Sequence, residues 1–273
     1  MELKRAAVSE SIGYLIIFGL ILTGIGLITL YGYPLLIAQQ SSANMRNMEE
    51  TMIVLQNDVK SLTYQLANYK ETSLMVNGGS LSLYGFSNTF QWFDIHWIDA
   101  LGNSHDYTFS PGELRYFSTN DDTVITLENG AVIEKPLSTN GSFMLADPRW
   151  YLDSSSSTLV INLMNLSTEP GTPQLLSETG VGTVSMRLLR SNMTMSSLQG
   201  SNPSVTITYY PDYRNITPDG YGFAWQTYLN NTNNFNGGMT CTGNPLIAQP
   251  LVCSLPNVQN IIIKEYDIVV ETI

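Results

Sequence analysis

The feature that most constrains this chain is a long stretch without charge near its N-terminus. No Asp, Glu, Lys or Arg occurs from Ser11 through Met45, and the apolar part runs from Ile12 to Ala38. A helix needs about 20 apolar residues to cross a bilayer, and a secretory signal peptide has an apolar region of only about 7–15 residues. The alternative is a helix buried in a soluble core, but so long a charge-free run is rare outside membranes. We therefore predict one transmembrane helix over residues 12–38.

The distribution of charge sets the orientation of this helix. Lys4 and Arg5 precede the apolar run, so the positive-inside rule places the N-terminus in the cytoplasm and the chain after Ala38 outside. The net charge is −11, and the part after Thr72 holds seven Lys and Arg residues against seventeen acids. Such an acidic surface argues against nucleic acid as a partner.

The helical pattern continues beyond the predicted span. Apolar residues recur alternately three and four positions apart, which predicts a seam along one helix that runs from residue 7 to residue 71; these residues are Met45, Met48, Met52, Leu55, Val59, Leu62, Leu66 and Tyr69. Pro34 lies inside this helix and should kink or loosen it. Two interpretations of the seam remain open: it docks on the protein's own head, or the upper span and lower seam pack against sister helices.

From residue 72 to residue 273 the pattern is typical of β-structure. Apolar residues from Leu81 to Ile98 indicate early strands, interrupted by turns at Gly78-Gly79 and Gly102-Asn103. Asn129-Gly130 joins two alternating runs, residues 123–128 and 131–134, and predicts a hairpin with a type I′ turn. Further strands are expected at residues 158–163, 181–189, 205–210, 222–229 and 260–271. The fold class is thus α+β, a long N-terminal helix followed by a two-layer antiparallel β-sandwich-like head.

Two sets of residues suggest an extracellular head. Cys241 and Cys253 are the only cysteines, and in an oxidising exterior they would close a disulfide worth roughly 2–4 kcal/mol; the alternative is two buried thiols. Asn-x-Ser/Thr sequons, which would accept N-linked sugar, occur at Asn140, Asn165, Asn192, Asn215 and Asn230. Some of them are expected by chance in a chain so rich in Asn, Ser and Thr.

The N-terminal residues resemble a known leader. The segment Lys-Arg-Ala-Ala-Val-Ser-Glu-Ser-Ile-Gly-Tyr-Leu, residues 4–15, looks like the class III leader of archaeal type IV pilins and archaellins. In that family a prepilin peptidase cuts on the cytoplasmic side, and the apolar helix stays in the mature protein. The resemblance covers about the first seventy residues. It implies a leader of residues 1–6 with cleavage after Ala6, or next to it at Arg5 or Ala7.

The resemblance also implies partners and a location. They are the membrane before assembly, the prepilin peptidase, the assembly platform and copies of the chain in a filament at the cell surface. Archaellins more often have Gly next to the cut, so Ala6 fits a pilin or pilin-like protein better than a main archaellum subunit.

Glu10 has two interpretations. In bacterial pilins an acid at the fifth mature position pairs with a neighbour's N-terminal amine during assembly, and Glu10 would be at position four or five here. An acid in hydrocarbon needs such a partner. Alternatively, Glu10 lies at the headgroups and favours the positive end of the helix by about 0.3–1 kcal/mol.

No constellation of residues predicts an enzyme. His96 and His105 are the only histidines, and no metalloprotease, nucleophile-elbow, phosphate-loop or dinucleotide-binding motif occurs. His96 is expected to be an ordinary strand residue, and we expect no cofactor and no metal, although Asp121-Asp122 and the loop at 230–238 carry oxygen ligands. The sequence thus predicts a filament subunit with an exposed adhesive head, or alternatively a single-span anchored binding module that does not polymerise.

Overall fold

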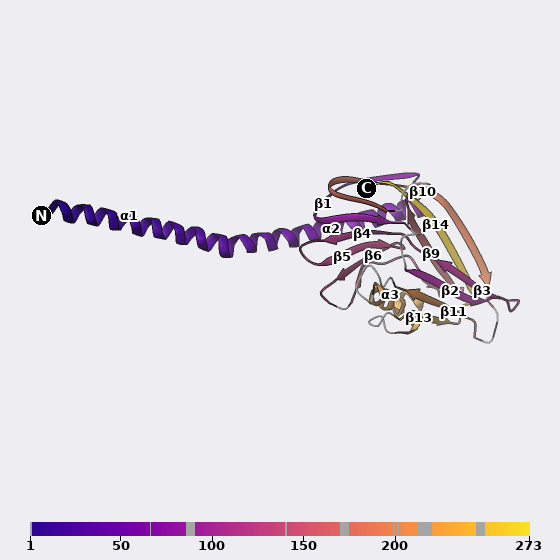
Figure 1. The fold of residues 1–273 in the computed structure, drawn as a ribbon. Coiled ribbons are helices and arrows are strands. Elements are labelled where there is room, and N and C mark those ends of the chain that lie inside the picture. The colour runs from indigo at the N-terminus through magenta and orange to yellow at the C-terminus, as the bar shows by residue number, and fades with distance from the viewer. Residues whose placement is uncertain are drawn as a thin grey trace. The chain divides into compact units, whose positions relative to one another are not determined.

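The computed structural model describes residues 2–65, 67–85, 91–139, 141–169, 175–198, 200, 202–211, 220–243 and 249–273, with the side chains of these residues except 2–11 and 175. The chain forms two compact units, residues 1–45 and residues 46–273. Figure 1 shows the ribbon of both units.

The first unit is helical throughout its described residues. It comprises α1 (Glu2–Leu27), a π-helical turn η1 (Ile28–Gly32) and the start of α2 (Tyr33–Tyr64). In the π turn the Tyr33 N–H donates to the Ile28 carbonyl oxygen, five residues back. Pro34 follows at once and has no N–H to donate, so the helix is loosened next to the proline as predicted. This helix is long and apolar enough to cross a membrane.

The second unit begins with the rest of α2, whose apolar seam is buried. Its members Met48, Met52, Leu55, Val59 and Leu62 are each at most 2% exposed. The helix ends at Tyr64, earlier than the predicted residue 71, and Leu66 lies outside the described residues. Tyr69 is instead the first residue of strand β1 and pairs with Arg187. Here pairing with a neighbouring strand overrides the helical pattern of the local sequence.

The described strands form two sheets. The order in the nine-stranded sheet is β7 (Phe143–Ala146), β6 (Ala131–Pro136), β5 (Thr123–Glu128), β4 (Glu113–Ser118), β1 (Tyr69–Tyr84), β10 (Leu175–Ser197), β14 (Asn260–Thr272), β9 (Thr158–Ser167) and β8 (Tyr151–Asp153). The order in the five-stranded sheet is β12 (Thr240–Thr242), β13 (Leu251–Pro256), β11 (Ser204–Tyr210), β2 (Trp92–Ile98) and β3 (Ser104–Phe109). The α+β class is confirmed at this level.

Alternation along the strands gives the nine-stranded sheet two buried faces. Leu159, Ile161 and Leu163 of β9 join a core that also contains Phe93 and Ile207 of the five-stranded sheet. The intervening residues of β9, among them Val160 and Met164, are buried on the opposite face. On that face the ring of Tyr64 in α2 meets Tyr266 of β14 edge-on, with ring centroids 5.9 Å apart. The seam of α2 therefore packs on one face of the nine-stranded sheet, and the five-stranded sheet packs on the other face.

Two predictions about the strands are wrong. Residues 222–229 form a helix, α3 (Gly222–Leu229), which is followed by the short helix α4 (Thr232–Phe235). Aromatic residues favour strands, but here Ala224, Trp225, Tyr228 and Leu229 are buried at helical spacing, so tertiary packing overrides the local preference. Gly78-Gly79 lies within β1 at a bulge rather than in a turn between strands. Among the described strand pairs β14 and β9 are parallel and the others are antiparallel, so the sheets are largely antiparallel, as expected.

Other local predictions are confirmed. The hairpin of β5 and β6 has Glu128 opposite Ala131, and both turn residues have positive φ, 48° at Asn129 and 75° at Gly130, as a type I′ turn requires. The Gly102 N–H donates to the Asp99 carbonyl oxygen in the predicted turn between β2 and β3. The predicted early-strand residues Phe86 and Phe90 lie outside the described residues.

Candidate functional site

The predicted processing and assembly residues lie in the first turns of α1. Lys4, Arg5, Ala6, Ala7 and Glu10 all have helical backbone. The structure therefore places them directly before the apolar helix and on the same continuous element. It describes no side chain among them, so both interpretations of Glu10 remain predictions.

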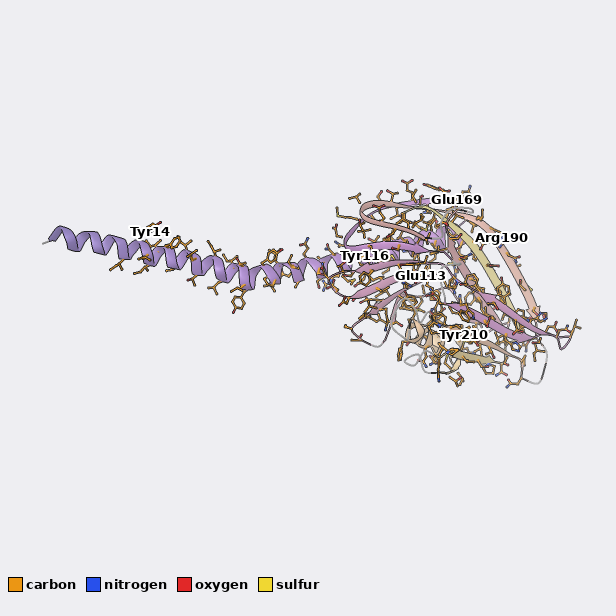
Figure 2. All side chains as sticks on the ribbon, viewed as in Figure 1. Tyr14, Glu113, Tyr116, Glu169, Arg190 and Tyr210 are labelled. Atoms are coloured by element: carbon orange, nitrogen blue, oxygen red, sulfur yellow. A yellow bond between two sulfur atoms is a disulfide. The ribbon has the colours of Figure 1, made fainter. Side chains whose placement is uncertain are left out.

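The apolar helix carries a surface that no other part of its own unit covers in the described residues. Every large apolar side chain from Ile12 to Ile37 is exposed, from 39% at Ile37 to 72% at Tyr31. Figure 2 shows side chains projecting above and below the ribbon of this helix, with Tyr14 labelled. A helix that is apolar all round is stable only when lipid or other protein surrounds it. This surface is the first part of the candidate functional site.

A buried glutamine of α2 forms hydrogen bonds that hold the seam residues Met48 to Leu62 on the head. The Gln56 Nε2 atom donates to the carbonyl oxygens of Gly130 (2.6 Å) and Asp147 (3.0 Å), while the Lys60 Nζ atom donates to the Gln56 Oε1 atom (2.9 Å). Gln56 is 1% exposed, so its amide would be costly to bury without these partners. The part of the seam from Met48 to Leu62 thus docks on the protein's own head, in agreement with the first of the two interpretations.

The head also contains a pair of buried acids that face each other across β4 and β5. Glu113 and Glu128 are directly paired and are 1% and 0% exposed. Arg115 forms an ion pair with Glu113, which also accepts hydrogen bonds from the hydroxyls of Tyr221 (2.9 Å) and Thr126 (3.1 Å).

Among the residues that the structure describes, the second acid, Glu128, forms no ion pair. The Trp225 Nε1 atom donates to Glu128 Oε1 at 3.1 Å. Burial raises the pKa of Glu128 well above its usual value, and the neighbouring charge of Glu113 raises it further. Because solvent does not reach either carboxyl, we assign the pair to the architecture of the head rather than to chemistry on a substrate.

The cysteines and histidines of the head occupy structural positions. Cys241 and Cys253 form a disulfide between the paired strands β12 and β13. His96 alternates with buried Ile95 and Trp97 along β2, as predicted, and its Nδ1 atom lies 2.7 Å from Asp106 Oδ1 on β3. Among the described residues no group of three or more His, Cys, Asp or Glu side chains is arranged to hold a metal ion.

Comparison with known proteins gives one family. The model of the Family of unknown function (DUF7289) matches residues 6–271. The chain belongs to this family. No curated protein and no solved structure matches the chain. Since the match runs from Ala6 to Glu271, the apolar helix and the head are both part of what defines the DUF7289 family.

The sequons of this DUF7289 chain differ in accessibility. Asn192 on β10 and Asn230 at the end of α3 are exposed. Asn165 on β9 is half-buried, and its Nδ2 atom donates to Asp267 Oδ1 at 3.2 Å. Asn140 and Asn215 lie outside the described residues. Glycosylation remains a prediction, and it fits Asn192 and Asn230 better than Asn165.

Sequence reasoning missed two features of the head. The acid pair escaped notice because Glu113 and Glu128 are fifteen positions apart and look like ordinary polar strand residues. The alternation of side chains along β5 was a usable signal for Glu128. Val124, Thr126 and Glu128 lie on one face of this strand, and Val124 belongs to the core. The other feature is a cleft beside β3, which is lined by residues of β3, β9, β10 and β14 and of the loops after β3 and β9, and only the tertiary fold brings these segments together.

Proposed function

We propose that this protein is the structural subunit of a type IV pilus-like surface filament. The observation that carries the proposal is the helix surface from Ile12 to Ile37, which is apolar on all sides and exposed over its whole length. Once out of lipid, such a surface must be buried, and sister helices provide an apolar environment of the same kind. The leader-like residues directly before it supply the processing site that the proposal requires.

The difference in burial between the two parts of the helix supports the same proposal. The seam from Met48 to Leu62 is already occupied by the protein's own head, so the apolar surface before it is what remains for the filament core. The head, whose two sheets contribute side chains to one core, would then lie on the outside and make surface contacts. Before assembly the chain would be a single-span membrane protein with a cytoplasmic N-terminus.

The leader provides the test. In the native host, a chain with both Lys4→Gln and Arg5→Gln should keep its full mass and stay in the membrane, because the peptidase would no longer recognise the basic pair. Filaments sheared from these cells should lack the protein. Arg46→Gln, which removes a cation beyond the apolar helix, is the matched control and should be processed normally.

The alternative function predicts another outcome. A non-polymerising anchored binding module would stay in the membrane fraction whether or not the leader is intact. Recovery of the unaltered chain only from washed membranes would therefore replace the filament proposal with that alternative.

A further inference from the structure

A pocket of about 650 Å³ lies beside the last turns of α2. The helix lines it from Val54 to Gln65, and Lys70 of β1 and Arg149, which precedes β8, complete the lining. All of these residues belong to the second unit. The volume is within the range of small-molecule sites. We call this site the α2 pocket.

Positive charge predominates in the α2 pocket. Lys60, Lys70 and Arg149 line it, and Asp58 is the one acid among the lining residues that the structure describes. The Asp58 carboxylate already has partners, since it lies 3.7 Å from Lys70 Nζ and accepts a hydrogen bond from the Thr72 hydroxyl at 2.5 Å. Three cations against one acid leave an excess of positive charge, although the net charge of the chain is −11.

Two of the three cations have no carboxylate beside them. Among the described residues neither Lys60 nor Arg149 forms an ion pair. The Lys60 Nζ atom donates only to the neutral amide oxygen of Gln56, at 2.9 Å. The Arg149 guanidinium lies over the ring of Tyr64, 4.8 Å from the ring centroid. Both cations are therefore available to a ligand.

The charges of these two residues also act on each other. Burial lowers the pKa of the half-buried Lys60 ammonium, the charge of Asp147 opposes this effect, and the charge of Arg149 adds to it. Asp147 does not line the pocket and forms no ion pair with Lys60 in the described structure. A negative charge bound between Lys60 and Arg149 would relieve their repulsion.

From this arrangement we propose that the α2 pocket binds an oxyanion, the chemistry that carboxylates and phosphates share. The planar guanidinium of Arg149 can donate two parallel hydrogen bonds to such a group, and the Lys60 ammonium has two N–H groups besides the one that it donates to Gln56. The excess positive charge disfavours a cation, and a neutral ligand would leave that charge uncompensated. The proposal goes beyond filament formation.

The oxyanion has two possible sources. It can be a small free anion, or it can be a carboxylate of a neighbouring copy of the chain, which has 23 Asp and Glu residues against 12 Lys and Arg. The second source rests on the proposed filament, and the first does not. A free anion would bind to isolated chains and to filaments alike. A neighbour's carboxylate would occupy the pocket in filaments and exclude added anion there.

The test is isothermal titration calorimetry on isolated full-length chains in a non-ionic detergent, at neutral pH and low salt. The probes are inorganic phosphate and citrate, titrated separately. At least one should bind, and Arg149→Gln should weaken its binding roughly tenfold, which is the effect of losing about one charge-assisted hydrogen bond. Lys60→Gln should also weaken it. Because Arg149 has no acid partner in the described structure, Arg149→Gln should leave the melting temperature nearly unchanged.

Arg46→Gln is the matched control, because it removes the same charge from an exposed position of α2 outside the pocket. It should leave binding unchanged. The proposal is overturned if neither anion binds, if binding survives both pocket variants, or if Arg46→Gln weakens binding as much as Arg149→Gln does. Isolated chains give this result whether or not the filament proposal holds. Repeating the titration on sheared filaments then separates the two sources.

Discussion

At the scale of single residues, the head contains two buried acids that face each other on adjacent strands. Glu113 and Glu128 are paired across two strands, and Arg115 forms its ion pair with Glu113. A carboxyl that is both desolvated and beside another acid favours its neutral form. The protonation of Glu128 is therefore coupled to folding.

The pH dependence of unfolding tests this coupling. The pKa of Glu128 is raised above its ordinary value of 4.5 by folding, so its contribution to stability is fully present below pH 4.5 and is lost as the pH rises through the folded pKa. We expect the free energy of unfolding in urea to fall from pH 5 to pH 9 in the unaltered protein and to fall less steeply in Glu128→Gln.

The exposed residue Glu50 supplies the control for this series. Glu50→Gln should retain the slope of the unaltered protein. An identical slope in Glu128→Gln and the unaltered protein would mean that Glu128 does not carry the effect.

At the scale of elements, the decisive contact is between the lower half of α2 and the nine-stranded sheet. Five seam side chains are buried there, and each fully buried apolar side chain contributes about 1.5–3 kcal/mol relative to an exposed one. The sum is on the order of 10 kcal/mol, comparable to the whole stability of a typical domain. The lower half of α2 should therefore unfold together with the head.

Two neighbouring residues of α2 allow this to be measured. Leu55→Ala should lower the free energy of unfolding of the head by about 2–5 kcal/mol, because Leu55 is fully buried and the change leaves a cavity. Val54→Ala should change it by no more than about 0.5 kcal/mol, since Val54 is 48% exposed. Equal effects in urea unfolding followed by tryptophan fluorescence would show that the seam does not dock as described.

Elements specified by neighbouring residues could be predicted from the sequence, and those specified by distant residues could not. Asn129-Gly130 favours a type I′ turn by itself, and the seam repeats within one helix, so both were predictable. The parallel pairing of β14 with β9 joins residues about a hundred positions apart, and α3 is helical because of what Trp225 packs against. Of the candidate site, the leader and apolar helix were readable, whereas the cleft depends on register between β9, β10 and β14.

At the scale of the whole molecule, the chain combines two units that require different surroundings, water for one and an apolar environment for the other. Residues 46–273 bury their own apolar residues in a head, while residues 12–37 leave theirs exposed for lipid or other protein. The DUF7289 family match spans both units, so they act together in one protein. A filament subunit satisfies both demands, since its helix moves from lipid into a protein core while the head stays outside.

Mass spectrometry of the mature N-terminus tests the filament account most directly. The protein should be isolated from its native host both in sheared surface filaments and in washed membranes. We predict a filament fraction whose chain begins at Ala7, or at a position next to it, because the peptidase removes the leader before assembly. An intact chain that begins at Met1 and occurs only in the membranes would contradict the account.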